Sequence, residues 1–411
     1  MRNHIKLGVF GFGCVGQGLY DVLHKTQGIK AEIVKICVKD KTKKRSLPET
    51  LFTYTKEELL FHPDINVIVE LIDDADAAFE IVATALKNKK AVVTANKKMI
   101  AEHFEELFQL QQEYGVPLLY EAACCASIPI IRNLEEYYDN DLLNSVEGIF
   151  NGSTNYILTK IFSENLNFQT ALQQAQALGF AESDPKLDVE GFDPKFKLSI
   201  VLTHAFGIFI KPEQIFHYGI QNISEFDIKY AREKGYKIKL VASCRKIENK
   251  IYAAVFPKFV QTNDKLYNIN LEYNGITIES IFSEDQFFAG KGAGSYPTGS
   301  AVLSDISALT YGYKYEYKKY FQNNNLTLDT HFGLNVYIRY FEAEGLPNAD
   351  FLNIREKYTS VKESYIIGKI SLHTLINASW LHRKDINIIL LPEGIPEEIY
   401  ENIKTVELVS I

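Results

Sequence analysis

The sequence predicts an α/β protein in which an N-terminal, Rossmann-type doubly wound sheet precedes an α+β domain and a small C-terminal α/β domain. In residues 5–122, apolar strand-like runs alternate with amphipathic helical segments, which is typical of a parallel sheet covered by helices on both faces. Residues 236–288 instead show the period-two alternation of antiparallel strands. From about residue 331, short strand-like and helix-like runs alternate again, which predicts the third domain.

Composition and charge exclude several classes of protein. The chain has 411 residues, enough for two or three domains, and its net charge of -8 argues against a nucleic-acid or anionic-membrane partner. No apolar run approaches the roughly 20 residues of a membrane span, and no signal-peptide pattern opens the sequence. The five cysteines are scattered without a C-x-x-C pair, so neither a disulfide framework nor a zinc site is expected. These features predict a cytoplasmic protein.

The first strand, residues 5–10, leads directly into a glycine motif and then into a helix over residues 17–25. In a G-x-G-x-x-G motif at this place, the first glycine permits a tight turn, the second lets a pyrophosphate approach the backbone, and the third lets helix and strand pack closely. The helix N-terminus supplies N–H groups for the phosphates. A dinucleotide site is therefore predicted, the alternative being a glycine-rich turn without a ligand. The motif consists of Gly11, Phe12, Gly13, Cys14, Val15 and Gly16.

The second strand, residues 31–38, is followed by basic residues, where an NAD-specific site usually carries an acidic one. Lys39 stands at the end of this strand, and residues 43–45 add three more cations. A cation here suits the 2′-phosphate of NADP, which favours NADP over NAD, although Asp40 leaves the use of both cofactors open. The alternative is a solvated basic turn.

A strand that enters a turn, residues 91–101, carries further candidates for the cofactor site. In doubly wound sheets, ligands bind at the carboxyl ends of the strands, so Thr94, Asn96 and Lys97 are expected beside the nicotinamide. The other predicted elements of this domain are a strand over residues 65–72, helices over about 77–90 and 102–114, and a strand that ends at Glu121.

The second domain is expected to begin with a helix over residues 128–138 and a strand over 143–150. A polar turn, residues 151–155, then leads into a helix, and the next helix ends at Gly179, a residue type favoured just after a helix. Later in the chain, a second glycine-rich turn within residues 289–306 precedes a helix that returns to the first domain. The segment that follows, residues 314–330, is polar and linker-like.

An acidic loop followed by an apolar helix, residues 180–209, is the main candidate for substrate binding. Asp193-Pro194 predicts the start of the helix, because Asp is a good N-cap and Pro is tolerated at the first helical position. Lys197 then shares a helix face with Asp193, at the positive end of the helix dipole, where a lysine needs carboxylates nearby and its pKa tends to be lowered. Such a group suits a small zwitterion; the alternative is a solvated loop before a core helix. The loop carboxylates are Glu182, Asp184, Asp188, Glu190 and Asp193.

Together these motifs resemble the homoserine dehydrogenase family, over about residues 5–318 and in the same order. The strings NGSTNYIL and AE-x-DP-x-x-D-x-x-G-x-D-x-x-x-K are specific to that family. The resemblance rests on GFGCVG (11–16), TANK (94–97), EAACCASIPII (121–131), NGSTNYIL (151–158), GFAESDPKLDVEGFD (179–193), KFKL (195–198) and GKGAGSYPTGSAVLSDI (290–306).

The resemblance implies an NAD(P)-dependent interconversion of L-homoserine and L-aspartate 4-semialdehyde, on the route to threonine, methionine and isoleucine. Lys97 and Lys197 match the catalytic lysines of the family, and which of them carries the proton stays open. The implied substrate-binding residues are Glu182, Asp193, Asp188, Gly152, Ser153 and Thr154, and Gly294 joins the cofactor-binding residues. A structural sodium ion is implied at the Glu121 carboxylate and at the backbone carbonyls of Cys124, Ala126 and Ile128.

The resemblance also implies a domain plan and a homodimer or higher homo-oligomer. Residues 1–127 plus about 298–318 would bind the nucleotide, residues 128–297 would form the catalytic and dimerisation domain, and residues 331–411 would form a divergent ACT-like unit. The chain lacks the D-x-P-G-type turn of ACT domains, so threonine feedback inhibition is not expected. Two positions also depart from the family: Cys124-Cys125-Ala126-Ser127 replaces a glycine run, and Phe180 replaces a common tyrosine.

Two other functions compete with this interpretation. A semialdehyde dehydrogenase that acylates Cys124 or Cys125 would need a thiolate and a histidine base, and no histidine lies near them in sequence. A non-catalytic NADP-binding sensor would keep the fold without turning over substrate. Retention of both lysines and of the substrate carboxylates argues against the sensor.

Overall fold

A computed structural model of the chain describes residues 4–140, 142–181, 183–281, 283–322, 325–341 and 346–393. The chain divides into two compact units, each assembled from separate segments. The first unit comprises Met1–Asp141, Ser199–Pro212 and Gly290–Asn323, and the second comprises Leu142–Leu198, Glu213–Ala289 and Asn324–Ile411. Among the described residues, no helix combines the length and hydropathy that a membrane span requires.

The first unit is built on a parallel sheet that, among the described residues, runs in the order β3-β2-β1-β4-β5-β6. This is the strand order of Rossmann folds, in which the chain reverses its direction of travel at β1 and β4 and ligands bind beyond the strands' carboxyl ends. The predicted doubly wound sheet is therefore confirmed. Its strands are β1 (Ile5–Phe10), β2 (Ala31–Cys37), β3 (Phe52–Thr53), β4 (Val67–Glu70), β5 (Ala91–Thr94) and β6 (Leu118–Leu119).

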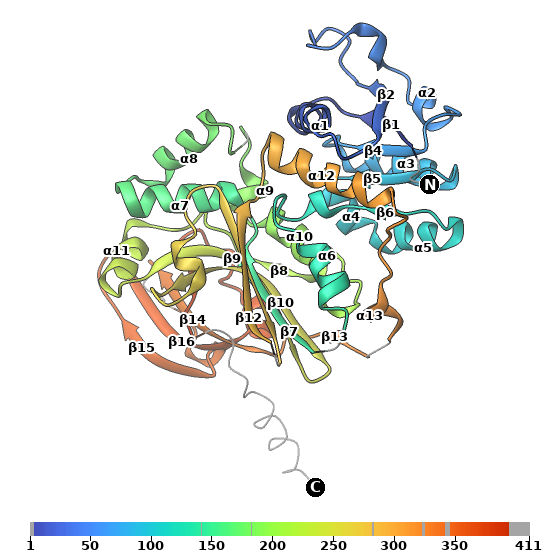
Figure 1. Cartoon of the computed structure of the whole chain (residues 1–411). Coiled ribbons are helices and arrows are strands. Elements are labelled where there is room, and N and C mark those ends of the chain that lie inside the picture. The colour runs from blue at the N-terminus through green and yellow to red at the C-terminus, as the bar shows by residue number, and fades with distance from the viewer. Residues whose placement is uncertain are drawn as a thin grey trace. The chain divides into compact units, whose positions relative to one another are not determined.

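Two helices far apart in sequence pack closely in this unit. Figure 1 shows α12 (Ser295–Leu309) beside α1 (Cys14–Lys25), and their contact depends on glycines. A Cβ atom on Gly18 would lie 2.1 Å from the Ser295 carbonyl oxygen, and one on Gly299 would lie 2.6 Å from the Leu19 nitrogen. The other helices are α2 (Glu57–Leu60), α3 (Ala75–Lys87), α4 (Lys97–Glu102), α5 (Phe104–Tyr114), α6 (Ile130–Arg132) and α13 (Lys318–Phe321).

The prediction of a polar linker over residues 314–330 is wrong for its first half. Tyr315 and Tyr317 are each 3% exposed, and the buried Lys319 ammonium donates to the carbonyls of Leu134 and His204. Tyrosine and lysine suggest a polar surface, but their apolar bodies can be buried when the polar tip finds a partner. His204, whose carbonyl accepts one of these bonds, is itself 1% exposed, and its ring nitrogens contact Glu135 and the Tyr120 hydroxyl.

The second unit contains a mixed sheet in the order β12-β11-β7-β9-β10-β17-β14-β16-β15 among the described residues, with β8 and β13 also paired to β10. Neighbours β9 and β10 are antiparallel over eleven residue pairs, as the alternation in residues 236–288 predicted. The strands are β7 (Leu143–Ile149), β8 (Phe216–His217), β9 (Lys237–Ile247), β10 (Lys250–Val260), β11 (Tyr273–Ser280), β12 (Glu284–Lys291), β13 (Thr327–Leu328), β14 (Gly333–Tyr340), β15 (Asn353–Tyr358), β16 (Ser364–Ser371) and β17 (Asn387–Leu390).

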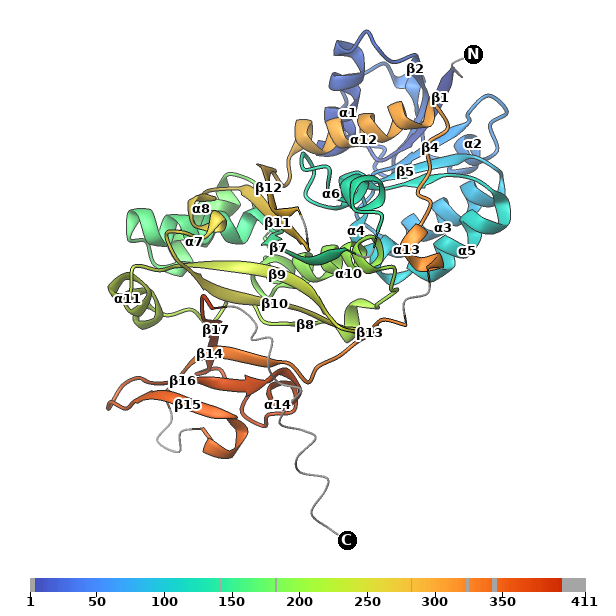
Figure 2. The ribbon, with the colours of Figure 1, turned by 60° about the horizontal axis from the view of Figure 1, so that its bottom comes forward.

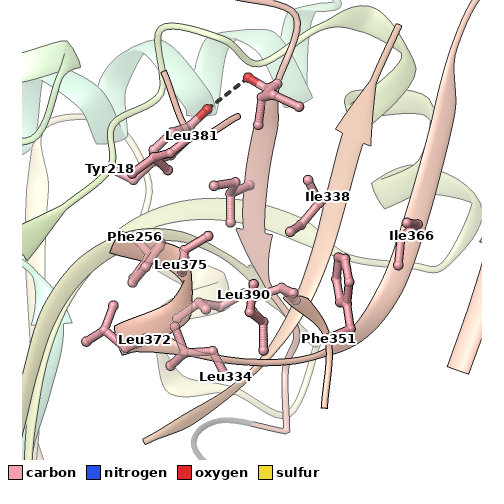
Figure 3. Packing of buried hydrophobic residues seen from close by; sticks show 14 of the residues in the cluster. Tyr218, Phe256, Leu334, Ile338, Phe351, Ile366, Leu372, Leu375, Leu381 and Leu390 are labelled. Carbon is pink, nitrogen blue, oxygen red and sulfur yellow. Dashed lines mark hydrogen bonds between the residues drawn. The ribbon is translucent and has the colours of Figure 1, made fainter. Parts of the chain in front are cut away.

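The C-terminal strands continue this sheet, as Figure 2 shows for β14 to β17 next to β10. They share an apolar core with β10, in which Phe256 packs among Leu334, Ile338 and Leu390 (Figure 3). The Tyr218 hydroxyl donates to the Ile386 carbonyl at 2.9 Å, which ties the loop before β17 to the rest of the unit. The helix-like middle predicted between β14 and β16 is wrong in part, because β15 lies there as an edge strand.

The helices of the second unit include one that begins earlier than predicted. The polar run over residues 151–155 is not a turn: Asn151 is the N-cap of α7 (Gly152–Glu164), and its Oδ1 accepts from the Thr154 amide at 2.8 Å. Asn, Gly, Ser and Thr favour turns and N-caps alike, so sequence could not separate the two. The remaining helices are α8 (Phe168–Ala177), α9 (Lys186–Val189), α10 (Phe192–Phe206), α11 (Glu225–Glu233) and α14 (Leu372–Ile376).

Candidate active site

The glycine motif forms a cradle between β1 and α1. Gly11 has a φ of +92°, and a Cβ atom there would lie 2.6 Å from the Leu71 carbonyl oxygen. A Cβ atom on Gly16 would lie 2.6 Å from the Gly11 carbonyl oxygen, so helix and strand pack closely as predicted. At Gly13, the N-cap of α1, no atom comes within 4 Å of such a Cβ atom. This open space at a helix N-terminus fits the approach of a pyrophosphate.

The ends of β4 and β5 hold Lys97 in place through hydrogen bonds. Asn96 is the N-cap of α4: its Oδ1 accepts from the Met99 amide at 2.9 Å, and its Nδ2 donates to the Ile72 carbonyl at 3.0 Å. Lys97 is the first residue of that helix and is half-buried. The side chain of Thr94, also predicted, accepts from the Asn96 amide at 3.0 Å, so Thr94 positions the cap that precedes Lys97.

Glu70 belongs to the same hydrogen-bonded group, and sequence reasoning missed it. It is fully buried, and its carboxylate accepts from the Thr94 hydroxyl at 2.5 Å and from the Ile72 amide at 2.6 Å. Burial raises the pKa of Glu70 to about 7. The sequence feature that could have identified Glu70 is its position as an acidic residue at the carboxyl end of an otherwise apolar strand.

The basic turn after β2 presents exposed lysines. Lys39 is exposed, together with residues 41, 43 and 44. The Asp40 carboxylate accepts from both the amide and the hydroxyl of Thr42 at 2.7 Å, and these bonds lower its pKa. Arg45 lies over the ring of Phe52 at 5.1 Å. The Asp40 carboxylate is therefore engaged by its own loop, while the lysines remain exposed.

The second unit brings together a buried polar cluster around Lys197. The Lys197 ammonium donates to Asp193 at 2.8 Å and to the Phe150 carbonyl at 2.7 Å. The predicted i, i+4 pairing on one helix face is confirmed, with α10 beginning one residue before the expected N-cap. The Nδ2 of Asn151 donates to Asp188 at 2.7 Å and to Asp193 at 2.8 Å. Asn151, Asp193 and Lys197 are 4%, 4% and 6% exposed, so this is a buried site rather than a solvated acidic loop.

Asn151 is the second residue of these hydrogen-bonded groups that sequence reasoning missed, although it is the first letter of NGSTNYIL. Of the three predicted residues that follow it, Thr154 bonds to Asn151, and Gly152 and Ser153 contact other segments. The Thr154 hydroxyl and amide both bond to the Asn151 side chain, at 2.9 and 2.8 Å. Gly152 lies against the backbone of Glu272, and the Ser153 hydroxyl donates to the Phe180 carbonyl. Phe180 itself packs on the ring of Tyr156. Glu182 lies outside the described residues.

The predicted ion site contains a buried cluster of charges in the first unit. The Glu121 carboxylate accepts from the amides of Ile131 and Arg132, both at 2.9 Å. Asp305 accepts from the Glu121 amide at 2.9 Å and from the Arg132 guanidinium at 2.6 Å. Burial, and next the charge of Asp305, raise the pKa of Glu121 to about 8, and burial raises the pKa of Asp305 to about 6.

The carbonyls implied for that site lie in a turn that keeps a glycine-like backbone. Cys125 and Ala126 have φ values of +55° and +39°, in the left-handed region that glycine adopts at no cost. Both side chains are buried, as is that of Cys124. The Ile128 carbonyl accepts from the Ile130 amide at 2.8 Å, which leaves it a second lone pair. Two of the residues that stand in place of the family's glycine run therefore adopt a left-handed backbone although neither is glycine.

Matches to known proteins extend over residues of both units. The family model described as "Homoserine dehydrogenase, NAD binding domain" matches residues 11–121, and the model described as "Homoserine dehydrogenase" matches residues 129–307. The chain is 35% identical over 313 residues to a homoserine dehydrogenase of Synechocystis sp., covering 74% of this chain and 72% of that protein.

Solved structures resemble the chain over a greater length. A homoserine dehydrogenase from Thiobacillus denitrificans superposes with a TM-score of 0.84 at 29% identity, covering 94% of this chain and 98% of the other. A hyperthermophilic archaeal homoserine dehydrogenase mutant in complex with NADPH superposes with a TM-score of 0.64 at 25% identity, covering 76% of this chain and 99% of the other.

Proposed function

The chain belongs to the homoserine dehydrogenase family, and from this premise we propose how its residues carry the reaction. It is an NAD(P)-dependent oxidoreductase acting on a CH–OH group, which interconverts L-homoserine and L-aspartate 4-semialdehyde in threonine, methionine and isoleucine biosynthesis. The observation that carries the assignment of roles is the buried cluster of Asn151, Asp188, Asp193 and Lys197. Homoserine-dependent reduction of NADP at alkaline pH, followed by absorbance, tests the activity, and a protein that binds NADP without reducing it would contradict it.

The cluster supplies charges of both signs for a zwitterionic substrate. Asp193 and Asp188, which Asn151 holds together, bind the substrate ammonium, and Glu182 is proposed to join them. Lys197 hydrogen-bonds the reacting oxygen, and as the substrate hydroxyl is oxidised a lysine accepts its proton. A bound nicotinamide would supply the hydride acceptor for this oxidation. Lys97, positioned by the Asn96 cap, is proposed as the second catalytic lysine.

We propose NADP as the preferred cofactor because the turn after β2 presents exposed lysines to the ribose, whereas its Asp40 carboxylate is already hydrogen-bonded to Thr42 in the same turn. Gly11 to Gly16 and Gly294 would hold the rest of the dinucleotide.

Lys39→Gln is expected to lower kcat/KM for NADP by about 10- to 100-fold, the value of one or two charge-assisted hydrogen bonds to the 2′-phosphate, and to leave NAD nearly unaffected. Steady-state kinetics with each cofactor would measure this. Lys41→Gln is the matched control, since it removes the same charge from the same loop where the ammonium lies over Tyr54 at 5.2 Å. An equal loss with both cofactors would contradict a role at the 2′-phosphate.

A sodium ion at Glu121 is supported by the local charge. When ionised, the buried Glu121 and Asp305 and the part-buried Arg132 carry a net charge of -1, which is unfavourable without a proton or a cation. A monovalent ion held by Glu121 and by the carbonyls of Cys124, Ala126 and Ile128 would balance this charge with oxygen ligands.

This proposal predicts a sodium effect on stability that depends on pH. Between the ordinary carboxyl pKa of 4.5 and the raised pKa of about 8, folded Glu121 holds a proton that the unfolded chain has lost, so stability falls as pH rises through this window. In choline chloride, Tm should therefore fall from pH 5 to pH 8, and sodium chloride at equal ionic strength should restore it at pH 8 but not at pH 5. Glu121→Gln should abolish the sodium effect; a sodium effect that survives in this variant would exclude Glu121 as the ligand.

The domain plan, a homodimer and a cytoplasmic location are proposed on the strength of the family resemblance. The C-terminal segment is proposed as a divergent ACT-like unit, supported by its β16–α14–β17 order. Adding threonine to the activity assay would test whether this unit regulates the enzyme, and no inhibition is expected.

A further inference from the structure

A cavity of about 360 Å³ lies in the second unit, away from every residue assigned above. Its walls are the C-terminal half of α7, the end of α11, the start of β9 and the short helix η5 (Lys265–Asn268). This volume falls within the roughly 300–1,000 Å³ that small-molecule sites occupy. Apolar and aromatic side chains form much of the lining, namely Leu158, Phe162, Tyr236, Ile238 and Tyr267.

Three cations line the cavity, and none of its lining residues is acidic. Among the described residues, no ion pair joins Arg232, Lys237 or Lys239 to a carboxylate. Neutral oxygens hold all three in place instead. Lys239 donates to the Asn155 side chain at 2.9 Å and to the Ile269 carbonyl, and Lys237 donates to the Tyr267 carbonyl at 3.0 Å. Arg232 donates to the Ile161 carbonyl at 3.0 Å.

Lys239 is the least favourable of these charges. It is 1% exposed, and burial, followed by the charge of Lys237, lowers its pKa to about 7. Burial also lowers the pKa of Lys237. A buried cation without a counter-ion is costly, and two neighbouring ones repel each other. An anion bound in the cavity would remove both penalties.

We propose that this cavity binds a small organic anion, whose carboxylate or phosphate group contacts Lys237, Lys239 and Arg232 while a short apolar or aromatic body packs against Phe162 and Tyr267. The cations of the cavity are already held by hydrogen bonds, so little side-chain ordering is needed when an anion binds. The apolar walls favour an anion with an apolar body over a small inorganic anion, which would lose its hydration shell there. The site is also joined to the substrate cluster through one helix. The N-cap of α7 is Asn151, and residues of its C-terminal half line the cavity.

The test is isothermal titration calorimetry on the full-length enzyme with NADP present, so that the dinucleotide site is filled. The probes are phenyl phosphate, benzoate and inorganic phosphate, with benzyl alcohol as the uncharged control. Saturable binding of phenyl phosphate or benzoate is expected, and which of them binds identifies the anionic group. Lys237→Gln and Lys239→Met should each weaken that binding about tenfold or more.

Lys234→Gln is the matched control, because it removes a nearby cation that does not line the cavity. It should leave the affinity unchanged. Lys239→Met removes a buried charge that has no carboxylate partner but also removes the donor to Asn155, so a thermal melt is run beside it, and Lys237→Gln gives a second reading if it does not fold. No saturable binding of either organic anion, equal binding of benzyl alcohol, or equal weakening by Lys234→Gln would overturn the proposal. These outcomes are independent of dehydrogenase activity, so they leave the proposed function untouched.

Discussion

Lys197→Met is expected to lower kcat by about 10²- to 10⁴-fold, the range that one positioned acid or base contributes. The ammonium of Lys197 is held at 2.8 Å from Asp193 and 2.7 Å from the Phe150 carbonyl, in a place that is 6% exposed. Methionine keeps the length and apolar body of the side chain but supplies neither charge nor proton. Steady-state kinetics in both directions, together with a thermal melt to confirm folding, would measure the effect. Lys97→Met is expected to show a loss of the same order.

Cysteine variants provide the opposing test. Cys124→Ser and Cys125→Ser are expected to keep most of the activity, because both thiols are buried, at 0% and 1% exposure, and a nucleophile must reach its substrate. If instead the cysteine variants were inactive and the lysine variants active, the enzyme would be one that acylates a cysteine.

Lys197→Arg retains a charge with a much higher pKa. A shifted pH profile in that variant, absent from Lys97→Arg, would identify Lys197 as the proton carrier.

Asp193→Asn is expected to raise KM for homoserine by about 10- to 100-fold and to lower kcat as well. Asp193 accepts from both Lys197 and Asn151 through one oxygen, so its charge orients the lysine and also serves the substrate ammonium. A charged hydrogen bond contributes about 1.5–3 kcal/mol, which corresponds to this change in KM. The substitution also removes the Asp193 charge from the buried Lys197 ammonium, which should cost stability on the order of 3–5 kcal/mol.

A double variant separates these two effects. Asp193→Asn combined with Lys197→Met removes both charges, so much of the lost stability should return while activity stays low. Asp184→Asn is the matched control in the same loop: that carboxylate is exposed and accepts from the Lys186 amide at 3.2 Å. It should leave KM within about twofold of the parent, as surface substitutions usually have small effects. A comparable rise in KM for Asp184→Asn would mean that the loop's net charge, not Asp193, binds the ammonium.

Much of the fold could be predicted because its signals are local. The strand, glycine motif and helix at the N-terminus are adjacent in sequence, and Gly11 and Gly16 meet the steric requirements that the motif predicts. The alternation in residues 236–288 likewise predicted antiparallel strands. Predictions failed where one residue type serves two purposes. Residues 151–155 suggested a turn but include the cap and first turn of a helix. Tyr315, Tyr317 and Lys319 suggested a polar linker but are buried.

The sequence by itself determined which residues could share a helix face, so the pairing of Asp193 with Lys197 followed from the period of the α-helix. Only the tertiary structure decided what surrounds that pair. Asn151 reaches Asp188 and Asp193 across 37 and 42 residues, and Glu70 meets Thr94 across 24. The left-handed backbone at Cys125 and Ala126 could not be predicted from their residue types either, because residues other than glycine rarely adopt it. Periodicity describes neighbours along one element, whereas contacts between elements depend on how the whole chain packs. Burial by that packing is the main cause of the raised pKa of Glu70 and of the lowered pKa of Lys239.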